Sequence, residues 1–187
     1  MNICIFCSAQ DVGDKYTKPA GELATLLATQ GHTLIWGGTN VGTMKVIADA
    51  AQAAGGRIEG ISMEILKHKA RKNADVMEFA KDLAERKAFM LERSDAIIVL
   101  PGGIGTLDEA TDVIAIKRHK LHDKPVLFLN IDGFYDGLKA QLERMDREGF
   151  LADRDGDVLV GLDTLVYFAQ TPHDALAWIE THAAKKG

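Results

Sequence analysis

Two glycine-rich stretches of the chain have the composition of loops that hold phosphate. Gly37-Gly38-Thr39-Asn40-Val41-Gly42 follows Trp36, and Pro101-Gly102-Gly103-Ile104-Gly105-Thr106 follows Leu100. Glycine lets backbone N–H groups approach an anion without interference from a Cβ atom, and a helix that starts after such a loop adds its dipole. Because each stretch lies between an apolar run and a helical pattern, we expect both to contact a phosphate-bearing ligand.

Neither stretch matches a standard nucleotide-binding motif. No Gly-Lys-Ser/Thr follows either one, which excludes a P-loop. Thr39 stands where the middle glycine of a G-x-G-x-x-G motif would be in the first stretch, and Asp108 stands at the last glycine position in the second. An NAD-dependent enzyme is therefore disfavoured.

Two cations occupy unexpected positions on the predicted helix Asp82–Arg93. On a helical wheel, Lys87 falls inside the apolar stripe and Arg86 falls at its edge. One interpretation is that both side chains extend to solvent and that Asp82 pairs with Arg86 at i, i+4. The other is that both cations face a cleft and meet an anion there.

Glu109 also has two interpretations. Thr106-Leu107-Asp108-Glu109 fits a capping box, in which the Glu109 carboxylate would bond back to the Thr106 amide. The same position places a carboxylate on the first turn of the helix whose N-terminus should hold the phosphate, which makes Glu109 a candidate catalytic residue.

No pattern of metal ligands is present, and we expect neither a metal nor a cofactor. Cys4 and Cys7 lie three residues apart in a strand pattern, so their thiols should point to opposite faces as buried structural cysteines. The six histidines lack ligand spacing, and Asp153, Asp155 and Asp157 do not form an EF-hand pattern. The basic run at 67–72 reads as a solvated loop that could attract an anionic substrate.

The bulk composition excludes several classes of partner. The net charge is −5, so the chain lacks the excess of lysine and arginine with which a nucleic-acid-binding domain neutralises phosphates. The longest uncharged stretch, Ala96–Leu107, is short and broken by proline and glycine, so we expect no membrane span. The start of the chain lacks the pattern of a signal peptide, which favours the cytoplasm. A length of 187 residues fits one domain, residues 1–187.

Strand and helix patterns alternate along the chain. Two runs, Ile97-Ile98-Val99-Leu100 and Val126-Leu127-Phe128-Leu129, are continuously apolar, as expected of parallel strands covered on both faces. The predicted strands are Asn2–Cys7, Thr33–Trp36, Arg57–Ile61, Asp75–Phe79, Asp95–Leu100, Pro125–Asn130 and Leu165–Ala169. The predicted helices are Tyr16–Gln30, Thr43–Ala54, Asp82–Arg93, Leu107–Lys120, Phe134–Arg147 and Pro172–His182. This alternation predicts an α/β fold, a Rossmann-like doubly wound sheet of about seven mainly parallel strands, with ligands at the strands' carboxyl ends.

The stretch from Pro101 to Glu109, P-G-G-x-G-T-x-x-E, together with the upstream Glu85-Arg86-Lys87, resembles the LOG (Lonely guy) family. Members are cytokinin riboside 5′-monophosphate phosphoribohydrolases, also labelled putative lysine decarboxylases. The resemblance implies a homodimer that cleaves the N-glycosidic bond of a nucleoside 5′-monophosphate. It implies Arg86 and Glu109 as the catalytic pair. The substrate-binding residues that we expect are Ser8, Gly38, Thr39, Lys87, Pro101, Gly102, Gly103, Ile104, Gly105 and Thr106.

The chain departs from the family pattern at four places. Thr39 replaces a third glycine, Ser8-Ala9 replaces Gly-Ser, and Leu83-Ala84 replaces Met-His. The stretch 116–120 replaces a Trp-x-Gln-Leu-Gly pattern. These differences fall on the expected base pocket and dimer surface, so the resemblance indicates a nucleotide more strongly than a cytokinin precursor.

A non-catalytic protein that binds or carries a nucleotide or molybdenum cofactor is the alternative function, because molybdenum-cofactor carriers resemble this family in fold and in a related glycine loop. The presence of both Arg86 and Glu109 favours an enzyme. Lysine decarboxylase ranks lower, since no lysine has a recognisable pyridoxal-phosphate context.

Overall fold

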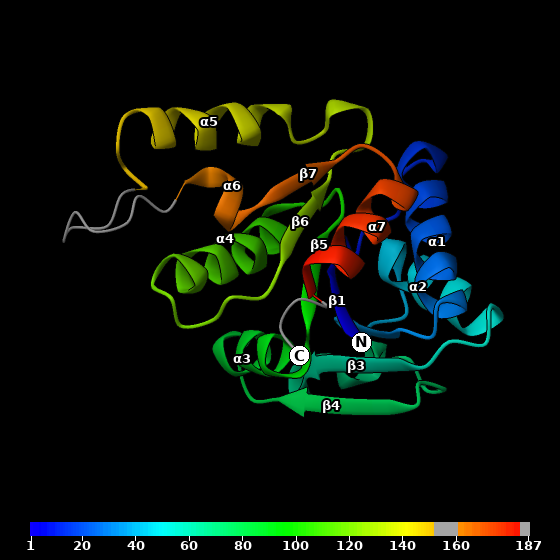
Figure 1. The fold of residues 1–187 in the computed structure, drawn as a ribbon. Coiled ribbons are helices and arrows are strands. Elements are labelled where there is room, and N and C mark those ends of the chain that lie inside the picture. The colour runs from blue at the N-terminus through cyan, green and yellow to red at the C-terminus, as the bar shows by residue number, and fades with distance from the viewer. Residues whose placement is uncertain (152–160, 184–187) are drawn as a thin grey trace.

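A single parallel sheet forms the centre of the computed structural model, which describes residues 1–151 and 161–183 (Figure 1). Its strands lie in the order β4-β3-β2-β1-β5-β6-β7, and every neighbouring pair is parallel. The strands are β1 (Asn2–Phe6), β2 (Thr33–Trp36), β3 (Ile58–Met63), β4 (Val76–Ala80), β5 (Ala96–Val99), β6 (Val126–Leu129) and β7 (Tyr167–Ala169). The predicted Rossmann-like sheet is confirmed.

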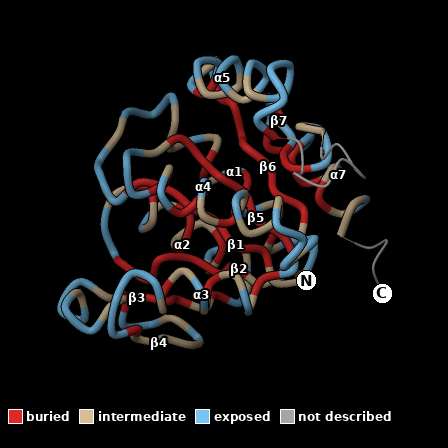
Figure 2. Tube along the Cα trace, turned by 90° about the vertical axis from the view of Figure 1, so that its left-hand side faces the viewer, coloured by how far each residue is buried: buried red, intermediate tan, exposed pale blue. Residues whose placement is uncertain are grey.

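Helices cover both faces of this sheet. One apolar cluster joins α1 (Asp14–Thr29), α2 (Gly42–Ala53) and α7 (Pro172–Ala183) to one face. The other cluster joins α3 (Leu83–Arg93), α4 (Ile104–Arg118), α5 (Asp136–Arg147) and the short α6 (Leu162–Leu165) to the opposite face. Figure 2 shows the central strands buried, whereas most of α5 is exposed. This arrangement explains the continuously apolar strands, since both of their faces are covered.

The order of the strands reverses beside β1. The chain passes from β1 outward to β4 and then returns to place β5 on the other side of β1, where Ile3 pairs with both Leu34 and Ala96. The loops that follow β1 and β5 therefore leave the sheet on either side of a switch point, where doubly wound folds bind ligands.

Several element boundaries differ from the prediction. Helix α4 begins at Ile104, three residues earlier than expected, because Gly103 serves as its N-cap. The residues Leu162–Leu165 form a helical turn, which leaves a three-residue strand β7. Two 3₁₀ turns, η1 (Glu64–Lys69) and η2 (Ile131–Gly133), were not predicted. The three aspartates at positions 153, 155 and 157 lie outside the described residues.

No described helix combines the length and apolarity that crossing a bilayer requires.

Gly42 is a backbone position that no other residue suits. Its φ of +55° lies in the left-handed region, and a Cβ there would overlap the carbonyl group of Ala9. We expect Gly42→Ala to lower the free energy of unfolding by about 2 kcal/mol or more, as strain and overpacking combine. Urea denaturation measures the change. Gly137→Ala, on α5 with open space around its Cβ, is the control and should cause no loss. Equal stability of the two variants would contradict the prediction.

Candidate active site

The second glycine loop leaves the start of α4 open. Gly103 is the N-cap and has no side chain to accept a hydrogen bond. The first amides of the helix, those of Ile104, Gly105 and Thr106, have no carbonyl of a preceding turn to bond. Thr106 is buried, whereas Ile104 is 82% exposed. The loop and helix start together offer N–H groups and a helix dipole to an anion.

A buried ion pair lies just beyond this helix start. The Arg86 guanidinium on α3 donates through Nη1 to the Glu109 carboxylate on α4. Its Nε donates to the backbone oxygen of Ile61, at 3.0 Å, on β3. Both side chains are about nine-tenths buried. Arg86 therefore neither extends to solvent nor pairs with Asp82, and the anion that its guanidinium meets is Glu109 of the same chain.

The capping-box interpretation of Glu109 is wrong. Because α4 starts at Ile104, Thr106 already lies inside the first turn, and Glu109 lies in the second. Its carboxylate turns inward to Arg86 instead of back to the Thr106 amide. Burial raises the pKa of Glu109 above its ordinary value, and the charge and hydrogen bond of Arg86 oppose this shift only in part.

The first glycine loop supports the same pair from the other side. A Cβ at Gly37 would overlap Nη2 of Arg86, so a larger residue there would displace the guanidinium from its present position. At the helix start that follows, the amide of Met44 donates to the carbonyl of Ser8 at 3.2 Å, so one N–H group there has a partner within the chain. The Ser8 hydroxyl accepts from the Gln10 amide at 2.9 Å. The two loops, similar in sequence, thus differ in how much of their helix start is available.

Arg71 ties the first glycine loop to the turn after β3. Its guanidinium contacts Asp49 at 2.7 Å, the Asn40 side chain at 2.9 Å and Gln52 at 2.6 Å. The backbone amide of Arg71 donates to the carbonyl of Gly38, and Thr39 forms an isolated antiparallel bridge with Ala70, the residue before Arg71. Sequence analysis missed Arg71, because in a basic run nothing distinguishes the one cation that is buried. The lysines and histidine at 67–69 are exposed, as predicted.

Lys87 is placed one helical position from Arg86 but has different partners. Its ammonium group lies between the carboxylates of Asp108 at 3.2 Å and Asp112 at 3.3 Å. Partial burial by itself would lower the pKa of Lys87, but the hydrogen bonds that its ammonium group donates to the two aspartates raise it above the ordinary value. Lys87 therefore joins α3 to α4 as a protonated lysine.

The two cysteines point to opposite faces, as the strand pattern predicted. Cys4 belongs to the apolar cluster with α3 and α4, and Cys7 belongs to the cluster with α1 and α2. Burial raises the pKa of both thiols, so neither is poised as a nucleophile.

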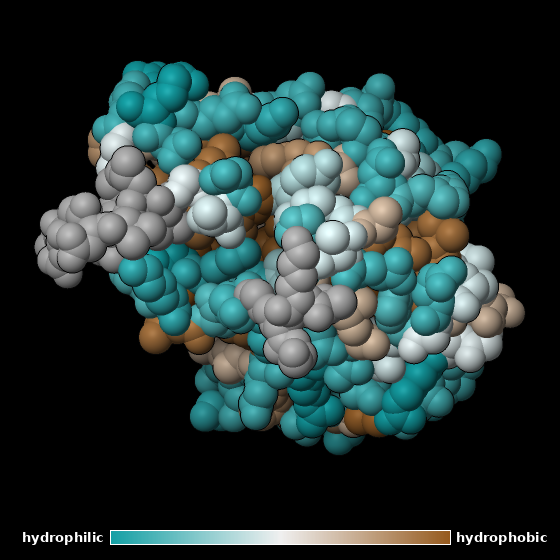
Figure 3. Space-filling model, viewed as in Figure 1, coloured by the Kyte–Doolittle hydropathy of each residue, from teal (hydrophilic) through white to brown (hydrophobic). Residues whose placement is uncertain are grey.

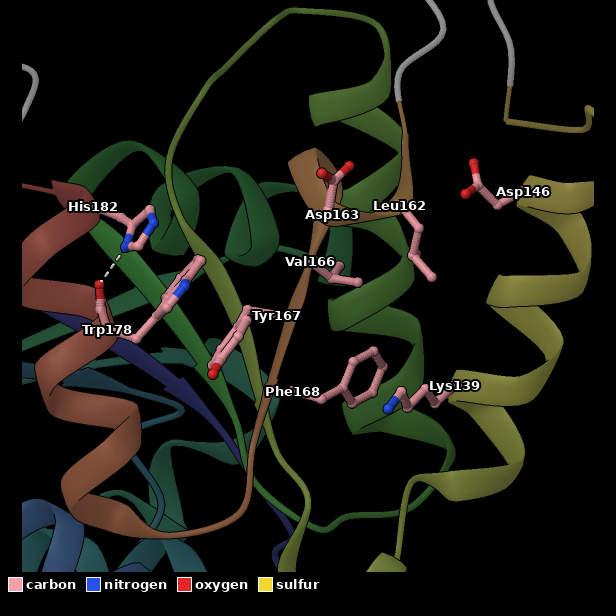
Figure 4. Close-up of a pocket in the computed structure, with 9 residues that line it drawn as sticks. All are labelled: Lys139, Asp146, Leu162, Asp163, Val166, Tyr167, Phe168, Trp178 and His182. Carbon is pink, nitrogen blue, oxygen red and sulfur yellow. Dashed lines mark hydrogen bonds between the residues drawn. The ribbon is translucent and has the colours of Figure 1, made fainter.

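A surface hollow of about 580 Å³ lies elsewhere, between α5, α6, β7 and α7. Figure 3 shows apolar surface beneath α5, and Figure 4 shows the side chains that line the hollow. The Trp178 ring is stacked on Tyr167 at 4.7 Å and on His182 at 4.2 Å between centroids. Both faces of the indole are therefore covered and cannot stack on a ligand base. No residue of the glycine loops lines this hollow.

The chain is similar to several known proteins. A family model described as possible lysine decarboxylase matches residues 44–170. The chain is 35% identical over 165 residues to the "Cytokinin riboside 5′-monophosphate phosphoribohydrolase" of Mycobacterium tuberculosis, covering 87% of this chain and 88% of that protein. It is 38% identical over 153 residues to the Arabidopsis thaliana enzyme of that name designated LOG5, covering 80% and 67%.

A solved structure is also similar. The molybdenum cofactor binding protein of Rippkaea orientalis superposes with a TM-score of 0.71 at 25% identity, covering 96% of this chain and 95% of that one.

Proposed function

The chain belongs to the LOG family, and we propose that it hydrolyses the N-glycosidic bond of a nucleoside 5′-monophosphate. The bond between C1′ and the base nitrogen breaks, a water oxygen bonds to C1′, and a proton of that water ends on the base. The products are the free base and ribose 5-phosphate. The buried pair of Arg86 and Glu109 beside an open helix start is the observation that carries this proposal.

The phosphate binds at the start of α4. The amides of Ile104, Gly105 and Thr106 donate to its oxygens, and the helix dipole favours its charge. Glu109 lies four residues after Gly105 on the same helix, which is an axial distance of about 6 Å. A ribose 5-phosphate held at the helix start can therefore present its C1′ toward Glu109. The phosphate supplies binding energy that is remote from the bond that breaks.

Glu109 acts on the sugar. Cleavage at C1′ develops oxocarbenium character, and a fixed carboxylate stabilises that charge or activates the incoming water. Arg86 holds the carboxylate in place: one of its nitrogens bonds Glu109, another bonds the Ile61 carbonyl, and a third lies against Gly37. The adjacent positive charge also favours the ionised form of Glu109, against the effect of burial.

The names of the relatives extend the proposal to the substrate class. AMP and cytokinin riboside monophosphates are the candidate substrates, since curated relatives at 34–38% identity are named as cytokinin riboside 5′-monophosphate phosphoribohydrolases. The similarity to a molybdenum cofactor binding protein keeps a carrier function as the second candidate. A non-catalytic carrier has no need of a buried carboxylate fixed beside the phosphate site, which favours the enzyme.

The proposal includes a cytoplasmic homodimer. Leu83 and Ile104 are both exposed. Leu83 lies four residues before Lys87 on α3, Ile104 lies four residues before Asp108 on α4, and the Lys87 and Asp108 side chains form an ion pair. The starts of α3 and α4 therefore place two large apolar side chains on one surface, which we assign to the contact with a second copy of the chain.

We expect the protein to release base from nucleoside 5′-monophosphates and not from the matching nucleosides, which lack the phosphate. Glu109→Gln should lower kcat by roughly 10²- to 10³-fold, as the loss of one electrostatic group does. Chromatography of the released base measures turnover. Glu143→Gln, on the exposed face of α5, is the matched control and should retain activity. Near-normal turnover by folded Glu109→Gln would sink the mechanism. A protein that releases no base yet copurifies with a phosphorylated pterin would be a carrier.

We expect kcat/KM to fall on the acid side with an apparent pKa above 4.5, the ordinary value for a glutamate. The reason is that the ionised carboxylate is the active form, and protonation removes it as the pH drops through the raised pKa of Glu109. A pH–rate profile, with circular dichroism to verify folding at each pH, measures this limb. An acid limb at or below 4.5 would show that burial does not raise the pKa of the working carboxylate.

We expect light scattering after gel filtration to give the mass of a dimer. Leu83→Asp should shift it to the monomer mass, because a carboxylate in a packed apolar contact loses its hydration. Phe150→Asp is the control, since Phe150 is also exposed but lies beyond the end of α5. A dimer that survives Leu83→Asp would place the contact elsewhere.

A further inference from the structure

Tyr135 lies outside both glycine loops and is hydrogen-bonded to the residue directly before the second one. Tyr135 follows β6 and precedes α5, and it is 2% exposed. Its hydroxyl donates to the carbonyl of Leu100 at 2.7 Å, across 35 residues of sequence. The phenol thus bonds the chain at the residue directly before Pro101, where the second glycine loop begins.

The carbonyl of Leu100 needs this partner. The amide of Leu100 donates to the carbonyl of Phe6 at 2.9 Å, so Leu100 still bonds the sheet through its N–H group. The next residue, Pro101, has no N–H group with which to continue the ladder. The ladder between β5 and β6 ends with the pair Val99 and Phe128, so the Leu100 carbonyl lies where the chain turns away from the sheet. A buried carbonyl left unpaired at that point would be costly. The hydroxyl of Tyr135 donates the hydrogen bond that this carbonyl needs, and so fixes the position at which the loop begins.

The position of the phenol is itself tightly determined. The Tyr135 amide donates to the Asn130 side chain at 2.6 Å, and that side chain donates to Asp136 at 2.8 Å. The phenol ring packs edge-on against Phe128 and Phe134, with 4.9 Å between centroids in each pair. A side chain held by a turn and by two rings has little freedom to follow the loop. The loop is therefore fixed relative to β6.

Gly102 passes this constraint on to α4. A Cβ at Gly102 would overlap the Thr106 side chain, so the loop backbone lies directly against the first turn of the helix. The Tyr135 hydroxyl, the Leu100 carbonyl, Gly102 and Thr106 thus follow one another from the end of β6 to the first turn of α4. We propose that the Tyr135 hydroxyl is a positioning group for the phosphate loop and that it sets the affinity for the 5′-phosphate of the substrate. This inference rests on the proposed function of the site.

Tyr135→Phe tests the hydroxyl alone, because the ring and its packing remain. The probes are ribose 5-phosphate and adenosine, together with AMP in a Glu109→Gln background that turns it over slowly, each titrated by calorimetry. We expect the variant to bind ribose 5-phosphate and AMP roughly tenfold more weakly, as the loss of one well-placed hydrogen bond does, while adenosine binding is unchanged. In turnover assays KM should rise by a similar factor with kcat nearly unchanged. Tyr167→Phe, at the sheet edge beside Trp178, is the matched control and should behave as the wild type.

The outcomes separate this inference from the proposed function. Wild-type affinity of Tyr135→Phe for ribose 5-phosphate would overturn the positioning role and leave the proposed function standing. An equal loss of affinity for AMP and adenosine would show a general structural effect and would also overturn it. Titrations are made at a temperature where circular dichroism shows the variant folded, so that unfolding does not enter the comparison. A wild-type protein that binds neither ribose 5-phosphate nor AMP would overturn the proposed function, and the inference with it.

Discussion

The buried ion pair between Arg86 and Glu109 is the interaction on which the arrangement of the site depends. A guanidinium removed from water needs partners for its donors, and breaking such a pair costs about 3–5 kcal/mol. Arg86 finds these partners on β3 and on α4, which lie on opposite sides of the switch point beside β1. The pair therefore joins the two halves of the sheet at the edge where we propose the ligand site. It also orients the carboxylate before any substrate arrives.

The surroundings of the pair follow from the space that it needs. Gly37 has no Cβ because the guanidinium occupies that space. The first glycine loop is bonded to other parts of the chain. The helix start after it bonds the carbonyl of Ser8, and its Asn40 side chain accepts from the buried guanidinium of Arg71. The second loop is anchored by the hydrogen bond of Tyr135 to the Leu100 carbonyl, and its Gly103 N-cap leaves the first amides of α4 without a side-chain partner. One loop thus shapes the site around the arginine, and the other offers the N–H groups.

Much of the fold could be read from local sequence. Continuously apolar runs at Ile97–Leu100 and Val126–Leu129 predicted strands buried on both faces, and the structure places both inside the sheet. Boundaries were less accurate, because a glycine can serve either as a loop residue or as an N-cap. At Gly103 this ambiguity moved the start of α4 by three residues and gave Glu109 the wrong local partner in the capping-box interpretation.

The sequence by itself determined the parallel α/β fold, the two glycine loops and the residue types of the site, because periodicity and glycine spacing are local properties. The motifs that include Arg86 and Glu109 also identified the family before any distance was known. Only the tertiary structure decided that these two side chains meet, that Arg71 is buried and that the phenol of Tyr135 reaches Leu100. Each of these contacts joins residues far apart in the chain. Their distances are set by how the strands are ordered in the sheet, which no local pattern specifies.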